Sequence, residues 1–162
     1  MEKVSINKDM KLSEYFTLGE LTKTSYKTED GNIPSRVAIE NLKNLCEDWL
    51  EDLRYSYNAL YPRGCPQKEI PLVINSGYRS SEVNKRAGGS VTSNHLTGCA
   101  VDIRVGGFEQ AIRYASILLD ISEGTKRDFD ELFIERNKAG SHWIHFAVRP
   151  KNNRRKTGFI MT

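Results

Sequence analysis

The stretch Ser93-Asn-His95-Leu-Thr-Gly98-Cys-Ala100-Val-Asp102 places a histidine seven residues before an aspartate, with a glycine between them. Glycine permits a tight turn, so the loop histidine can lie beside the carboxylate of a strand that we expect over residues 100–105. The other two histidines of the chain also fall in one short window, which ends at His145. Side-chain alternation puts His145 on one face of a strand expected over residues 143–149. If these two strands are neighbours, the two histidines and the aspartate converge.

Two neutral imidazoles and one carboxylate form a ligand set that suits zinc, and three protein ligands leave a fourth position for water. The sequence therefore indicates a metal site at His95, Asp102 and His145. An H-x6-D pair is a weak pattern by itself. From spacing alone a purely structural interpretation stays open, with His95 in a loop, Asp102 at a strand end and His145 satisfied in the interior.

Composition places the chain among ordinary globular proteins. It has 162 residues, 38% of them hydrophobic, and 24 Lys and Arg against 21 Asp and Glu give a formal charge of +3. At this length we expect one domain over residues 1–162, with a core large enough to fold without disulfides. Three cysteines without CxxC spacing favour neither a zinc knuckle nor a stapled secreted scaffold.

Positive charge gathers near the end of the sequence. Five basic residues and no acidic residue lie within 149–162, which we interpret as a basic C-terminal tail that can contact an anionic cell wall. No stacking aromatics are interleaved with these basic residues, so nucleic-acid binding is not expected. The first residues lack the apolar core of a secretory signal, and no stretch approaches the roughly 18 apolar residues of a bilayer span. We therefore expect a cytoplasmic chain as synthesised, without membrane insertion.

Capping residues and hydrophobic spacing predict a mixture of helices and strands. The expected helices are a short one opened by the Thr17–Glu20 capping box, a long one from Ser35 to Leu53, a short one from Ser80 or Ser81 to Arg86, and an amphipathic one with its apolar face at Phe108, Ala111, Ile112, Ala115, Leu118 and Leu119. The expected strands run over residues 70–76, 100–105, 132–135 and 143–149. The two types do not alternate regularly, so the predicted class is α+β.

Further motifs surround the histidines, and together they resemble a known family. They are Ser76-Gly-Tyr-Arg-Ser80, Val83-Asn84, Gly88-Gly89-Ser90, the stretch that opens this section, and Trp143-Ile-His145. In this combination the chain resembles the zinc D-alanyl-D-alanine peptidases of peptidoglycan, whose fold is shared with lysostaphin-type enzymes and the hedgehog signalling domain. It is most similar to the short phage and prophage branch, where motifs like Phe16–Leu21, Phe129–Leu132 and Asn153–Arg155 also occur.

The resemblance implies a role for each matching residue. His95, Asp102 and His145 match the metal ligands of the family. Arg79 matches the arginine that steadies the substrate or the oxyanion, a task that suits a forked and always charged group. Ser93 matches a serine that lines the substrate groove, and Tyr78 of the Ser-Gly-Tyr-Arg run is expected to contact substrate as well.

The general base is where this sequence departs from the family. In many relatives a Glu or Asp lies three residues before the last histidine, whereas this chain has His142 there. A histidine with a pKa near ~6.5 can do the same work, and we favour it. Glu131, Glu135 or Asp130, on or beside the preceding strand, are the alternatives.

The resemblance implies a zinc peptidase, with one Zn²⁺ per chain, acting on the stem peptide of peptidoglycan. It would cleave a bond involving a D-amino acid, as a D,D-carboxypeptidase or an L-alanyl-D-glutamate-type endopeptidase, after release from the cell in the manner of phage enzymes. The implied fold is a small, twisted, mainly antiparallel sheet with flanking helices, acting as a monomer. An inactive zinc-stabilised binding module is the alternative. Cys99 is expected to be buried filler and not a fourth ligand.

Overall fold

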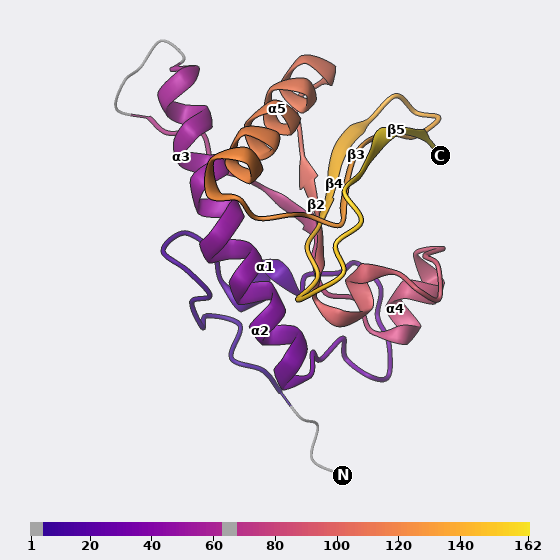
Figure 1. Ribbon diagram of the computed structural model, residues 1–162. Helices are drawn as coiled ribbons and strands as arrows, with labels where there is room; N and C mark the ends of the chain where they lie inside the picture. Colours follow the sequence, from indigo (N-terminus) through magenta and orange to yellow (C-terminus); the bar gives the residue numbers. More distant parts are fainter. Residues whose placement is uncertain (1–4, 63–67) are drawn as a thin grey trace.

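The computed structural model describes residues 5–62 and 68–162, which form an α+β fold (Figure 1). Its strands are β1 (Ile74–Ser76), β2 (Ala100–Arg104), β3 (Glu131–Arg136), β4 (His142–Ala147) and β5 (Lys156–Met161). They build one sheet in the order β1-β2-β4-β3-β5, antiparallel except for the parallel pair β3–β5. The predicted class and the mainly antiparallel sheet are confirmed. The first strand is shorter than expected because Pro71, which lacks an N–H, lies outside it.

The helices begin where the sequence places their caps. Thr17 and Glu20 form a complete capping box on α1 (Leu18–Leu21), and Ser35 caps α2 (Arg36–Leu45). Helix α2 continues through a π-helical segment, η1 (Cys46–Leu50), into α3 (Glu51–Leu60), so one long rod runs along the molecule (Figure 1). Ser80 caps α4 (Ser81–Arg86).

Helix α5 (Phe108–Thr125) buries only part of the predicted face, namely Ala111, Leu118 and, in part, Ala115. Its buried residues are Ala111, Tyr114, Ile117, Leu118 and Ser122. Phe108, Ile112 and Leu119 are exposed. The helix contacts β3, β4 and α3, where the ring of Tyr114 meets that of Tyr57 edge-on at 4.8 Å. This packing against the rod turns the helix away from the apolar stripe that spacing alone selected.

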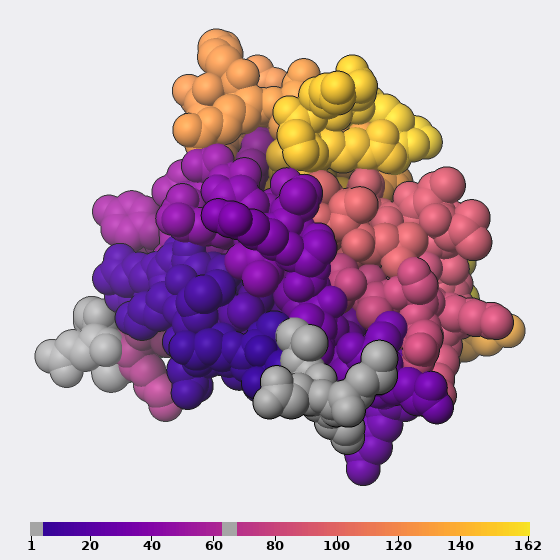
Figure 2. All heavy atoms as spheres, turned by 90° about the horizontal axis from the view of Figure 1, so that it is seen from below, coloured from indigo at the N-terminus to yellow at the C-terminus, as the bar shows by residue number. Residues whose placement is uncertain are grey.

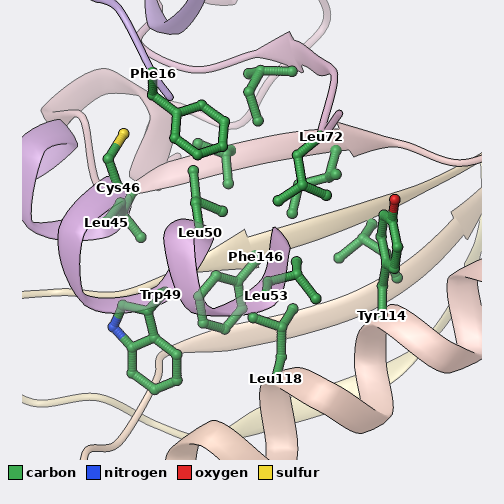
Figure 3. Close-up of a cluster of buried hydrophobic side chains, with 14 of the residues drawn as sticks. Phe16, Leu45, Cys46, Trp49, Leu50, Leu53, Leu72, Tyr114, Leu118 and Phe146 are labelled. Carbon is green, nitrogen blue, oxygen red and sulfur yellow. The ribbon is translucent and has the colours of Figure 1, made fainter. Parts of the chain in front are cut away.

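One hydrophobic core lies between the sheet and the helical rod (Figure 3). Trp49 of η1 meets Phe146 of β4 edge-on, with ring centroids 5.1 Å apart. Ile144 and Phe146 are fully buried on one face of β4. Side chains alternate along a strand, so His145 between them faces the opposite side of the sheet. The core thereby fixes which residues of β4 face away from the helices.

The basic C-terminal segment is not a solvated tail, which corrects that expectation. Residues 156–161 form β5, which pairs in parallel with β3 and places Lys156 level with Glu131. Arg155 donates hydrogen bonds to Glu123 and Asp128. Arg149, at the start of the segment, donates a hydrogen bond to Asn94, and yellow and salmon spheres lie next to each other in Figure 2. The sequence predicted a solvated segment because the acidic partners of these basic residues lie far away in the sequence.

Asp130 anchors this segment and is fully buried. It accepts hydrogen bonds from the backbone N–H, Nε and Nη2 of Arg154 at 2.7–3.0 Å. Nε of Arg149 lies 3.2 Å from the same carboxylate. A buried carboxylate requires such partners, since an unpaired charge in the interior is costly.

Cys46 and Cys99 are buried, as expected for Cys99, whereas Cys65 lies outside the described residues. Within the part of the chain that the structure describes, no helix combines the length and the apolar character needed to cross a membrane.

We predict that Asp130→Asn lowers the free energy of unfolding by about 3–5 kcal/mol at pH 7, because it removes a buried charge and leaves its arginine partners unpaired. Urea denaturation followed by circular dichroism measures this. Asp128→Asn is the matched control, since Asp128 forms an exposed pair with Arg155 and should change stability by only about 0–1 kcal/mol. Equal stability of the two variants would contradict the anchoring role.

The effect should also depend on pH. Burial by itself would raise the pKa of Asp130, but hydrogen bonds from Arg154 and Asn94 hold it well below the ordinary value of 3.8. A carboxyl whose pKa is lowered on folding contributes stability above its unfolded pKa and loses it as the pH falls through the folded pKa. The difference between wild type and Asp130→Asn should therefore be full at neutral pH and shrink below about pH 4.

Candidate metal centre

His95 lies in a short 3₁₀ turn, η2 (Asn94–Thr97), between α4 and β2. The Ser93 hydroxyl caps this turn by accepting from the backbone N–H of His95, and Gly98 ends it with φ of 71°. A Cβ at Gly98 would overlap the carbonyl oxygen of Ala38, so glycine is required by both conformation and space. The turn therefore presses the histidine loop onto the start of α2.

The tautomer of His95 follows from its contacts. Its Nδ1 lies 2.6 Å from the carbonyl oxygen of Gly77, an acceptor that fixes the ring proton on Nδ1. The lone pair of Nε2 then points toward Asp102, whose Oδ2 is 3.3 Å away. A metal-binding histidine is commonly held in this way through its second nitrogen.

Strand register brings the other two residues together. Asp102 of β2 lies directly opposite His145 of β4, and Nδ1 of His145 is 3.1 Å from Oδ1 of Asp102. One candidate ligand atom from each of His95, Asp102 and His145 lies within 4.8 Å of the others. The convergence expected from the sequence is confirmed as geometry, and this donor set fits zinc.

The surrounding charges favour ionised Asp102. Burial alone would raise its pKa, but His95 and His145 outweigh burial and hold the pKa well below its ordinary range. Burial lowers the pKa of His145, yet its hydrogen bonds to Asp102 and Glu131 raise it to about 10. Asp102 and Glu131 thus favour positive charge beside them, which here the protonated ring of His145 supplies.

A family model described as Peptidase M15 matches residues 14–127, which is most of the chain and includes His95 and Asp102. The chain belongs to the peptidase M15 family. M15 enzymes are zinc peptidases, so the chain is a metallopeptidase whose three-residue group could hold the metal. A search among curated proteins found no match.

Beside the ligand group of this M15 peptidase lies a groove of about 710 Å³. Arg79 and Ser93 line it, as the resemblance implies. Arg79 donates to Oδ2 of Asp102 at 2.8 Å and to the Ser76 hydroxyl at 2.9 Å. The structure thus brings the arginine to the metal ligands, while its Nη1 has no hydrogen-bond partner among the described residues.

Tyr78 does not line the groove, which corrects the expectation that it contacts substrate there. Its backbone N–H donates to the carbonyl of Leu21, and its half-buried side chain packs against the hydrophobic core. A Cβ at the preceding Gly77 would overlap the same carbonyl. This close approach to α1 directs the tyrosine toward the core.

The expectation that His142 acts as the general base is also corrected. Three positions along a strand reverse the side-chain direction, so His142 lies on the face of β4 opposite His145. Its ring contacts that of Phe108 at 5.6 Å and lines a separate pocket of about 420 Å³ with Arg104 and Ser141. It therefore does not face the ligand group.

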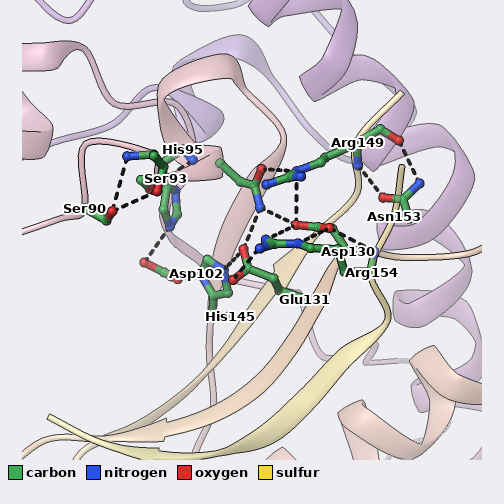
Figure 4. A network of polar contacts seen from close by, with 12 residues as sticks. Ser90, Ser93, His95, Asp102, Asp130, Glu131, His145, Arg149, Asn153 and Arg154 are labelled. Carbon is green, nitrogen blue, oxygen red and sulfur yellow. Dashed lines mark hydrogen bonds and ion pairs between the residues drawn. The ribbon is translucent and has the colours of Figure 1, made fainter. Parts of the chain in front are cut away.

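The three alternative carboxylates occupy different positions, and Figure 4 shows two of them, Asp130 and Glu131. Asp130 is fully buried and its carboxylate oxygens accept hydrogen bonds from Arg154. It therefore cannot reach a water in the groove and is not the base. Oε1 of Glu131 is 3.4 Å from Nε2 of His145 and also accepts from the Asn94 side chain. Glu135 lines the groove, and burial followed by the charge of Asp102 raises its pKa, although His145 opposes this shift.

Asn94 and Arg149 were not singled out from the sequence. Asn94 donates to both Asp130 and Glu131, and its Oδ1 accepts from Nε of Arg149 at 3.0 Å. The available signal was Asp130 directly after Phe129 and before the apolar residues Leu132–Ile134, because a carboxylate buried there requires cationic partners.

We predict that the purified M15 peptidase holds about one zinc per chain, and that His145→Ala and Asp102→Ala lose it, because three ligands are the minimum of such a site. His142→Ala is the matched control and should retain zinc. Elemental analysis after dialysis checks this. Zinc loss in His142→Ala alone would contradict the assignment of the ligands.

Proposed function

We propose that this M15 peptidase hydrolyses a bond involving a D-amino acid in the stem peptide of peptidoglycan. The observation that carries the proposal is the three-residue group in a groove that two further carboxylates, Glu131 and Glu135, also line. A groove of this size is typical of sites for small ligands and short peptides. The substrate would be cleaved at a D-alanyl-D-alanine or an L-alanyl-D-glutamate bond, at the cell wall, by a monomer with one zinc.

The arrangement favours an enzyme over an inactive binding module. Among the residues that the structure describes, the metal-binding group contains three members and no fourth protein ligand. Structural zinc sites are usually closed by four protein ligands, whereas catalytic sites keep one position open. Cys99, the residue that could have closed the site, is not a member of the group.

Zinc, when bound, lowers the pKa of water and polarises the scissile carbonyl. Arg79 supports the same chemistry from the protein side. Its guanidinium is held by Asp102 and Ser76, and its remaining nitrogen can donate to the carbonyl oxygen as negative charge develops there. Such a fixed donor costs little reorganisation during the reaction.

Glu131 and Glu135 have separate roles in this proposal. Glu131 accepts from Nε2 of His145 and so orients the ring with Nδ1 toward Asp102. Glu135 makes no hydrogen bond to a metal ligand, and burial raises its pKa above the ordinary value, which makes it a stronger base than an exposed carboxylate. Glu135 takes the proton from the attacking water and delivers it to the leaving amine.

We predict that Glu135→Gln retains zinc and loses roughly 10²- to 10⁴-fold in kcat, the usual contribution of a general base. Glu131→Gln should instead weaken zinc binding roughly 10- to 100-fold, because it removes the partner of a ligand. Competition with a chelator and peptide hydrolysis at saturating zinc measure the two effects. A Glu135→Gln enzyme with full kcat would exclude this residue as the base.

The substrate is tested with purified sacculi incubated with and without chelator. Mass spectrometry of the released fragments should show new stem-peptide ends only without chelator, and the ends identify the bond. Glu135→Gln serves as the matched inactive control. If zinc-loaded protein releases no fragment from sacculi or from soluble stem peptides, the proposed function is wrong.

A further inference from the structure

Two arginines are held side by side at one end of the groove by a single buried carboxylate. Asp130 receives Nε and Nη2 of Arg154 at 2.9 and 2.7 Å, and Nε of Arg149 at 3.2 Å (Figure 4). Asn94 holds Arg149 a second time through its Oδ1. Both guanidinium groups are therefore fixed before any ligand arrives.

The charges at this end of the groove do not cancel. Arg149, Arg154 and Lys156 line this end of the groove beside one carboxylate, Glu131, and a second carboxylate, Asp130, contacts the two arginines from below. Lys156 has no ion-pair partner in the described ranges. Asp130 lies beneath the surface with no exposed area. An anion in the groove would therefore meet a net positive charge.

Unused hydrogen-bond donors point to the same kind of ligand. Arg149 uses only its Nε, and Arg154 uses Nε and Nη2, in the contacts that the structure describes. Arg149 is about one-third exposed and Arg154 slightly more, at 31% and 39% of their side chains. A planar guanidinium with free N–H groups matches a carboxylate, and holding it in place removes part of the entropy cost of binding.

The arginines are also close to the reacting centre. Nη2 of Arg154 lies 3.9 Å from Glu131, whose other oxygen contacts the ligand His145. Asn94, the partner of Arg149, immediately precedes the ligand His95. A peptide bound with its scissile bond at the metal would thus place a neighbouring residue beside this arginine pair.

We propose that Arg149 and Arg154 form a subsite for a free carboxylate of the substrate, next to the bond that is cleaved. The α-carboxylate of a γ-linked D-glutamate in a stem peptide is a group of this kind. The inference rests on the proposed function and adds a specificity to it: the enzyme distinguishes a stem peptide with this carboxylate from one in which it is amidated.

The test uses two synthetic peptides, L-Ala-γ-D-Glu-L-Lys-D-Ala-D-Ala and the same peptide with the glutamate α-carboxylate converted to an amide. Zinc-loaded wild type should cleave the carboxylate peptide with a kcat/KM roughly 10- to 100-fold higher, mainly through KM, as expected for a charge-assisted hydrogen-bond pair. In Arg149→Gln and Arg154→Gln this ratio should fall toward one. Arg154→Lys, which keeps the charge but loses the fork, should keep part of it.

Arg155→Gln is the matched control, because it removes the same charge from the same segment but contacts Glu123 and Asp128 outside the groove. It should keep the wild-type ratio. A wild-type ratio near one, or an equal loss on both peptides in Arg149→Gln and Arg154→Gln, would overturn the subsite and indicate a purely structural arginine pair.

Calorimetry of the two peptides with the zinc-loaded Glu135→Gln and wild-type proteins separates this inference from the proposed function. Preferential binding of the carboxylate peptide without any hydrolysis would support the subsite and overturn the function. Hydrolysis of both peptides with equal affinity would support the function and overturn the subsite.

Discussion

The antiparallel register of β2 with β4 is the constraint on which the site depends. It sets Asp102 opposite His145, and a slip of one residue would turn one of them into the hydrophobic core. The register is held from the other side of the sheet, where Val101, Ile103, Ile144 and Phe146 are completely buried. The hydrophobic effect therefore positions the two candidate ligands on the sheet, Asp102 and His145, although neither belongs to the hydrophobic core.

The third ligand depends on loops and not on the sheet. His95 is held by a turn that requires Gly98 and by the carbonyl of Gly77, a glycine packed against α1. A second set of contacts joins this loop, through Asn94 and Asp130, to Arg154 in the segment that precedes β5. Loop, sheet and C-terminal segment thus share one buried polar network, and such networks define a single arrangement when every member is satisfied.

Much of this fold follows from local signals in the sequence. The caps at Thr17, Ser35 and Ser80 mark the true helix starts, because capping depends on neighbouring residues alone. The convergence of His95, Asp102 and His145 was predicted from residue type and strand spacing, and the resemblance implied their role as ligands. The sequence did not predict strand β5 or the exposure of Phe108, Ile112 and Leu119 on α5. Both features depend on contacts with elements that are distant in the sequence.

The errors within the site have the same origin. His142 was favoured from its distance in sequence to His145, but strand alternation places it on the other face, against Phe108. Tyr78 was assigned from a motif, whereas close packing at Gly77 directs it to the core. The different surroundings of Glu131 and Glu135 arise from the β3–β4 pairing and from the contact of Glu131 with Asn94. Both are long-range contacts, which a local sequence pattern does not reveal.

The parallel pairing of β5 with β3 has a consequence for the order of events during synthesis. All three ligands precede β5 in the chain, yet Arg154, which holds Asp130 and through it Asn94, is translated after them. A nascent chain that has been synthesised as far as His145 therefore contains all three candidate ligands. It still lacks the Arg154 contacts that fix the loop carrying His95. These contacts cannot form before Arg154 has been synthesised, so the loop that carries His95 becomes fixed only after this residue has left the ribosome.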